Sequence, residues 1–144
     1  MKGSYCLIFE VKSDLNVEVR NGRAFQLKRG IYVYCGSAFG SGGLKRRVLR
    51  HMKRNKKRHW HIDFLTTREE TDFLGVWIFE GKRFECKLAK EVSAVGEAIL
   101  GFGSTDCKCE SHLFKVKSLN SLEEALKSFN GKFLKPNEVE KYGV

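Results

Sequence analysis

The sequence lacks the features of a membrane-spanning or secreted protein. No apolar run approaches the roughly 20 residues that a transmembrane helix needs. The chain leads directly into Tyr5–Phe9, without the apolar core and small-residue cleavage site of a signal peptide. Its five cysteines are an odd number and are widely spaced, unlike a secreted disulfide framework. We therefore expect a cytoplasmic protein with reduced thiols and no membrane partner.

Acidic residues are outnumbered in this chain. Its 144 residues include 27 Lys and Arg against 17 Asp and Glu, a formal net charge of +10. This balance favours an anionic partner and nucleic acid first, although a ribosome-associated or membrane-surface protein would share it. The length suits a single domain, 1–144, and without a heptad seam a monomer is the default expectation.

The pattern of apolar residues predicts an α+β domain, with helices packed on a small antiparallel sheet. Alternation predicts a strand over 3–12, and β-branched and aromatic runs predict strands over 30–35 and 73–79. Asn21-Gly22 between 17–20 and 23–27 is typical of a type I′ hairpin, which we expect to be an insertion that protrudes away from the functional site.

Helical spacing predicts helices from Leu44 to Met52, over 84–99, and from a capping box at Ser121 and Glu124 to about residue 129. Ser41 is the candidate N-cap of the first helix. Residues 59–65 suit either a strand or a short helix, and 112–117 suit an edge strand. The expected organisation is a core over 3–100 followed by a C-terminal extension over 101–144.

The segment 45–58 contains no acidic residue and nine basic ones. Like charges at helical spacing repel one another unless a polyanion neutralises them, so phosphate contacts are the favoured interpretation and a solvated helix face is the alternative. We expect nucleic acid, with DNA favoured, to contact Arg46, Arg50, Lys53, Lys56, Lys57 and His61.

Four short motifs together resemble the GIY-YIG nuclease superfamily. They are Gly3-Ser4-Tyr5, then Tyr34-Cys35-Gly36, then Arg47 and His51 four residues apart on the basic helix, and finally Glu85 at the start of a later helix. Further likeness to a small archaeal and bacterial branch, DUF123-like, lies in 36–38, 59–63 and 101–114. The resemblance implies that Tyr5, Tyr34, Arg47 and His51 are catalytic and that Glu85 binds Mg²⁺ or Mn²⁺.

Gly30-Ile31-Tyr32 spells the first motif of that superfamily literally. It shares a strand with Tyr34, however, whereas the two motif tyrosines must come from neighbouring strands. We therefore expect Tyr5 to take this role, with the Asn21-Gly22 hairpin accounting for the long separation of the motifs.

The function implied by the resemblance is a metal-dependent endonuclease that hydrolyses DNA phosphodiesters in repair or processing, with a repair enzyme as a candidate partner. Tyr5 or Tyr34 would be the general base, Arg47 would stabilise the phosphorane charge, and His51 would orient the water or a tyrosine hydroxyl. The alternatives are a catalytically silent nucleic-acid-binding module and a zinc-stabilised adaptor.

Two further groups offer metal-ligand chemistry. Cys86, Cys107, Cys109 and His112 are zinc-ligand types, but their spacing favours buried cysteines with a backbone-bonded histidine, and structural zinc or a redox-sensitive thiol pair stand as alternatives. On a strand, His59, His61 and Asp63 would share one face and could bind metal or phosphate. A packed aromatic segment is favoured there, with His61 as its one functional residue.

Overall fold

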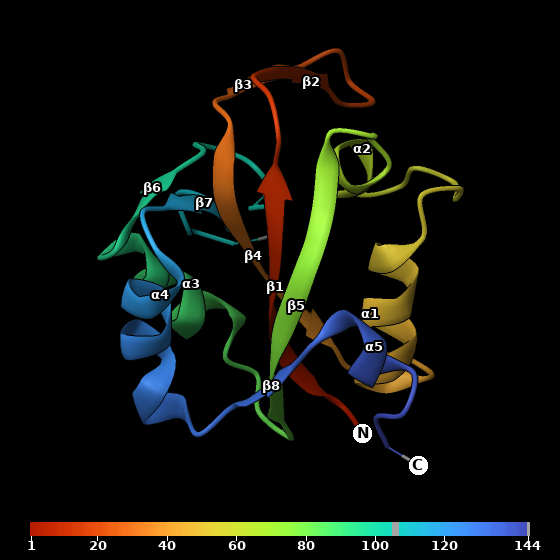
Figure 1. The fold of residues 1–144 in the computed structure, drawn as a ribbon, viewed down its shortest axis with the longest axis vertical. Coiled ribbons are helices and arrows are strands. Elements are labelled where there is room, and N and C mark those ends of the chain that lie inside the picture. Colours follow the sequence, from red (N-terminus) through yellow and green to blue (C-terminus); the bar gives the residue numbers. More distant parts are fainter. Residues whose placement is uncertain (105–106, 144) are drawn as a thin grey trace.

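A six-stranded antiparallel sheet forms the centre of the computed structural model, which describes residues 1–104 and 107–143 (Figure 1). The predicted α+β class is confirmed. The strand order across the sheet is β6 (Gly96–Ala98), β7 (Leu113–Val116), β4 (Gly30–Ala38), β1 (Gly3–Val11), β5 (Thr71–Glu80) and β8 (Lys132–Leu134).

The alternation of β1 supplies two hydrophobic cores, one on each face of the sheet. Tyr5, Leu7 and Phe9 lie in one core, while Cys6 and Ile8 lie in the other. The first core packs against α1 (Gly43–Met52), α2 (Asp63–Thr66) and α5 (Pro136–Val139), and the second against α3 (Glu85–Ser93) and α4 (Leu119–Leu126). A 3₁₀ turn, η1 (Lys127–Phe129), follows α4. The helices therefore form layers on both sides of the sheet (Figure 1).

The predicted hairpin forms its own two-stranded sheet, β2 (Leu15–Glu18) and β3 (Ala24–Leu27), at one end of the molecule (Figure 1). The turn is not the predicted type I′, because Gly22 has a positive φ of 85° whereas Asn21 does not. The loop runs over 20–22, between Val19 and Arg23, whose backbones are hydrogen-bonded. The expectation that the hairpin points wholly away from the functional site is wrong. Phe25 is buried, and its ring centroid lies 5.7 Å from that of His61, because its apolar face needs a packing partner.

The helix expected over 84–99 ends at Ser93, and Gly96–Ala98 becomes the edge strand β6. A Cβ on Gly96 would lie 2.9 Å from the carbonyl oxygen of Lys115, so the close pairing of β6 with β7 suits glycine. As a result β7 is an interior strand, not the predicted edge strand. Residues 59–65 contain the short helix α2.

The C-terminal part contributes to the central sheet rather than extending from it. β7 pairs with β4 near the centre, and β8 pairs with β5 at the edge. Neither β8 nor α5 was predicted, since each is only one turn or a few residues long and is defined by its tertiary neighbours.

Both predicted helix caps differ from those in the structure. The N-cap of α1 is Gly42, not Ser41, and the N-cap of α4 is Ser118, whose side chain accepts a hydrogen bond from Ser121 N. A Cβ on Gly43 would lie 2.4 Å from the carbonyl oxygen of Met1. The N-terminal residues thus approach the start of α1 too closely for a larger residue.

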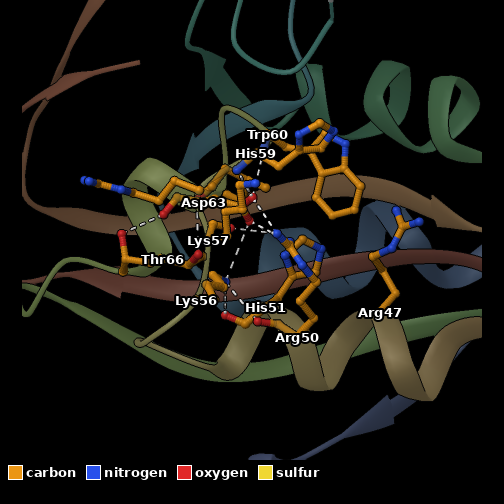
Figure 2. A network of polar contacts seen from close by, with 12 residues as sticks. Arg47, Arg50, His51, Lys56, Lys57, His59, Trp60, Asp63 and Thr66 are labelled. Atoms are coloured by element: carbon orange, nitrogen blue, oxygen red, sulfur yellow. Dashed lines mark hydrogen bonds and ion pairs between the residues drawn. The ribbon is translucent and has the colours of Figure 1, made fainter. Parts of the chain in front are cut away.

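A buried carboxylate joins α1 to α2 (Figure 2). Asp63 is fully buried and accepts two hydrogen bonds from Arg50, each 2.9 Å long, through both carboxylate oxygens. The backbone amides of His59 and Trp60 also donate to Asp63 Oδ2. Burial alone would raise the pKa of this carboxyl, but the hydrogen bonds from Arg50, Trp60 and His59 lower it below its usual value.

Lys56 completes this network from the end of α1. Its Nζ atom donates to the carbonyl oxygens of Arg50 and His51, at 2.9 and 3.1 Å, and lies 3.8 Å from Asp63 Oδ1. The Lys56 side chain is only 5% exposed. The cation therefore caps the carbonyl end of α1 and helps to balance the charge of Asp63.

We predict that Asp63→Asn lowers the free energy of unfolding by about 3 kcal/mol, because Arg50 and Lys56 would lose their buried partner. Since the folded pKa of Asp63 is lowered, its contribution is present above the unfolded pKa of roughly 3.9 and is lost as pH falls through the folded value. Urea unfolding of both proteins between pH 3 and 7 measures this, and the difference between them should shrink at the acidic end.

The control is Asp72→Asn, which removes a carboxylate that is 45% exposed and pairs with Lys12 and Arg54 on the surface. Such a pair contributes less than about 1 kcal/mol. Equal losses for the two variants would show that the Asp63 network has no special role in stability.

Candidate functional site

A polar cavity of about 390 Å³ opens between β1, β4, α1 and the start of α3. The six sequence-predicted residues on its lining come from separate parts of the chain: Tyr5, Tyr34, Arg47, His51, His61 and Glu85. The sheet register explains part of this convergence. Tyr5 pairs with Gly36 and Leu7 with Tyr34, so the two tyrosines lie on neighbouring strands and the same face.

The shortest contact in the cavity joins β1 to α1. Tyr5 Oη and His51 Nε2 are 2.7 Å apart, and both side chains are buried. Burial lowers the pKa of His51 to about 3, helped by the cations of Lys56, Arg47 and Arg50, with Asp63 opposing. Burial also raises the pKa of Tyr5, although Arg47 opposes that rise. At neutral pH the pair is therefore a phenol beside a neutral imidazole.

Gly36 makes room for the Tyr5 ring. A Cβ on Gly36 would lie 2.5 Å from both the Oη and Cζ atoms of Tyr5. The glycine of the Tyr34-Cys35-Gly36 motif thus permits the neighbouring tyrosine to lie flat across β4. Tyr34 is partly buried beside it, and burial raises its pKa well above the usual value, with Tyr5 and Glu85 adding to the effect.

Tyr32, from the literal Gly-Ile-Tyr sequence, does not line this cavity. It is fully buried, its hydroxyl donates to the carbonyl oxygen of Lys28, and its ring stacks on Phe9. Tyr32 is therefore a core residue, in line with the choice of Tyr5 over Tyr32.

Arg47 is held beside the cavity without an acidic partner. Its Nη1 atom donates to the Ser37 carbonyl oxygen at 3.1 Å, and its guanidinium lies 4.4 Å from the Trp60 ring centroid. Within the described residues it forms no salt bridge, and no dashed line reaches it in Figure 2. Its charge is thus oriented but not neutralised by a carboxylate.

Trp60 is a site residue whose role the sequence did not predict. Its ring also lies 4.4 Å from the guanidinium carbon of Arg50, so it separates two arginines on one helix. The aromatic segment 59–65 was the available signal. From the sequence, a tryptophan between two histidines could equally be a core residue. Its contact with the arginines becomes visible only when the position of α1 is known.

Glu85 is the first residue of α3, and its side chain is 37% exposed in the cavity wall. Ser37 Oγ donates to Glu85 Oε1 at 3.2 Å, and His112 Nδ1 lies 3.9 Å from Oε2. Each carboxylate oxygen has two lone pairs, so acceptor capacity remains. One carboxylate facing a cavity with room for several waters fits Mg²⁺ or Mn²⁺, which retain several water ligands.

The predicted nucleic-acid contacts divide into three groups. Arg46, Lys53 and Lys57 are exposed on or just after α1. Arg50 and Lys56 differ from these three, because both cations pair with the buried Asp63, although both also line a groove beside α1. Asp63 lies 13 residues after Arg50, and no pattern in the sequence identifies it as the partner of that arginine.

His61, the last of these predicted contacts, borders the cavity. Its Nδ1 atom accepts a hydrogen bond from Gly103 N at 3.2 Å, which leaves the proton on Nε2 as a donor. Asp63 belongs to α2 and pairs with Arg50, and among the described residues it does not form a group of possible metal ligands with His59 and His61.

The interpretation of the cysteines as buried side chains is wrong for one cluster. Cys6 and Cys35 are buried, but Cys86 is exposed and Cys107 and Cys109 are partly exposed. Within 1–104 and 107–143 the His112 ring has no hydrogen bond to backbone, and its Nε2 atom faces Cys107 Sγ at 3.3 Å. These four residues lie beside the cavity, with Cys107 and His112 on its lining.

No helix in the described part of the chain has the length and apolar character required to cross a membrane. No curated protein and no solved structure is similar enough to the chain to be matched. A family model does match residues 4–134, which is more than half of the 144 residues and covers every cavity residue described above. The chain therefore belongs to the family described as domain of unknown function DUF123.

Proposed function

We propose that this protein is a metal-dependent endonuclease of the GIY-YIG type that hydrolyses phosphodiester bonds in DNA. The observation that supports it is one cavity that contains a hydrogen-bonded tyrosine and histidine, an arginine without an acidic partner, and a carboxylate. Phosphodiester hydrolysis needs a route for the proton of water, positive charge near the phosphorus, and a site for a divalent cation.

Tyr5 is the favoured general base because it alone of the two motif tyrosines bonds to His51. In this proposal, water attacks phosphorus and gives its proton to Tyr5 Oη, while the Tyr5 hydroxyl proton passes to His51 Nε2. Transfer of both protons together avoids a free phenolate, which the raised pKa of Tyr5 disfavours. When the P–O ester bond breaks, Tyr5 would give its proton to the leaving oxygen and take back the proton from His51, a return that the low pKa of His51 favours.

Arg47 would stabilise the charge that develops on the phosphoryl oxygens. Its position is fixed by the Ser37 carbonyl and the Trp60 ring, so little side-chain freedom is lost when it meets the phosphate. Glu85 would hold Mg²⁺ or Mn²⁺, and the ion would supply further positive charge to the phosphate.

The DNA backbone would extend over the exposed face of α1. A groove there is lined mainly by α1 and the following loop, including Arg50 and Lys56 of the Asp63 network, and also by the carboxylate of Glu140. The cations of the groove outside that network are Lys45, Arg46 and Lys53. These side chains supply positive charge without sequence information, which suits phosphate contacts. A role in DNA repair or processing, beside a partner enzyme, is the context we infer for such an activity.

A catalytically silent nucleic-acid-binding module is the second candidate. The observation that favours it is burial, because Tyr5 and His51 are only 1% and 3% exposed. In such a module their hydrogen bond would serve packing, and the exposed cations alone would carry the function.

We predict that Glu85→Gln removes cleavage of supercoiled DNA in Mg²⁺ or Mn²⁺ and changes DNA affinity by only a few-fold. The amide keeps the shape of the side chain but has one acceptor oxygen and no charge for the cation. Gel-based cleavage and fluorescence anisotropy would be measured on the same preparations. Wild-type turnover in this variant would remove Glu85 from the catalytic site, and binding without cleavage by the wild type would favour the silent module.

We predict that Tyr5→Phe lowers the cleavage rate by roughly a hundredfold or more, as expected for a lost general base. The matched control is Tyr32→Phe, which removes a hydroxyl from a neighbouring strand outside the cavity. It should cleave at the wild-type rate while losing about 1 kcal/mol of stability. If Tyr34→Phe shows the larger loss instead, Tyr34 is the base and the contact between Tyr5 and His51 only positions the helix.

We predict that Lys53→Ala and Lys57→Ala each reduce the slope of log affinity against log salt by roughly one unit, equally for different DNA sequences. Lys56→Ala is the contrast, since its cation is buried in the Asp63 network. It should lower the midpoint of thermal unfolding and leave the salt slope unchanged. An equal slope change for all three lysines would return Lys56 to the phosphate-binding surface.

A further inference from the structure

Four side chains outside the proposed chemistry converge on one point beside the cavity. The ligand atoms of Cys86, Cys107, Cys109 and His112 all lie within 4.8 Å of one another. Cys107 Sγ is 3.3 Å and Cys86 Sγ is 4.0 Å from His112 Nε2. We propose that these residues bind one structural Zn²⁺ ion, separate from the divalent cation at Glu85.

The separations come within about 1 Å of those of a tetrahedral zinc site. Zn–S and Zn–N distances of about 2.3 and 2.05 Å place neighbouring ligand atoms roughly 3.5 to 3.8 Å apart at tetrahedral angles. Three thiolates and an imidazole form one of the usual ligand sets for structural zinc, and soft sulfur ligands disfavour Mg²⁺ and Mn²⁺. Because four protein ligands complete the coordination, no position remains for substrate.

The cluster joins parts of the chain that are distant in sequence. Cys86 belongs to the first turn of α3, whereas Cys107 and Cys109 come from the segment before β7. His112 is anchored by its backbone, since its N–H donates to the Phe102 carbonyl and its carbonyl accepts from Cys35 N–H. Zinc would therefore fix the cysteine segment against both α3 and the sheet.

The same ion would position one wall of the cavity. His112 Nδ1 lies 3.9 Å from Glu85 Oε2, so a shift of about 1 Å would let the carboxylate accept a hydrogen bond from the ring whose Nε2 atom faces the thiols. Metal-bound histidines commonly have such a carboxylate partner, which also sets the tautomer. Glu85 directly precedes Cys86, so zinc would hold the proposed cation ligand in place through two neighbouring residues.

Elemental analysis of the untagged protein tests the proposal without any nuclease assay. We expect about one zinc per chain in the wild type and in Glu85→Gln, and loss of zinc in Cys109→Ser. The control Cys35→Ala, which alters a buried cysteine outside the cluster, should retain the metal. Cobalt substitution of the wild type should give the intense visible bands of tetrahedral Co²⁺ with thiolate charge transfer.

Two results would overturn the proposal. One is wild-type protein that is folded, free of metal and unable to bind Zn²⁺ or Co²⁺ after reduction. The other is Cys109→Ser protein that retains a full equivalent of zinc. If Cys109→Ser does not fold, a mercurial thiol reagent and a chromogenic chelator applied to the wild type decide the question, since release of one zinc on thiol modification is expected. Failure of cleavage with zinc present would count against the proposed function alone.

Discussion

The pairing of β1 with β4 is the constraint on which the rest of the site depends. The register that places Tyr5 opposite Gly36 also places Leu7 opposite Tyr34. Side chains alternate along a strand, so a slip of one residue would move Tyr5 to the opposite face, away from α1. Because Gly36 has no side chain, the phenol can cross β4 and reach His51. The hydrogen bond between sheet and helix is therefore a consequence of one register and one glycine.

The basic helix α1 uses its cations for different purposes on different faces. One face carries Arg47 and His51 into the cavity, and another carries Arg50 to the buried Asp63. The remaining face presents residues such as Arg46 to solvent. The buried charge pair fixes the loop that presents Trp60, and the Trp60 ring in turn lies against Arg47. Trp60 therefore links the structural cation of Arg50 to the proposed functional cation of Arg47.

Glu85 lies where two proposed metal environments meet. It accepts a hydrogen bond from Ser37 on β4, approaches His112 and borders the cavity. A rigid cysteine and histidine cluster behind it would reduce the freedom of a carboxylate that is otherwise one-third exposed. A cation site with a single carboxylate needs that carboxylate to be held in a fixed position, since the remaining ligands would be water and substrate.

The central strands, the hairpin, the first helix and six of the residues that line the cavity could be predicted from the sequence, because they follow from alternation, helical spacing and short motifs. The tertiary structure fixed the remaining features. It assigned Arg50 and Lys56 to Asp63, ended α3 at Ser93 so that β6 could pair, and brought Cys86 to the later cysteines. All three features depend on contacts between residues that are far apart in the sequence, and the ligand set alone spans 26 residues. Periodicity along the chain carries no information about such contacts.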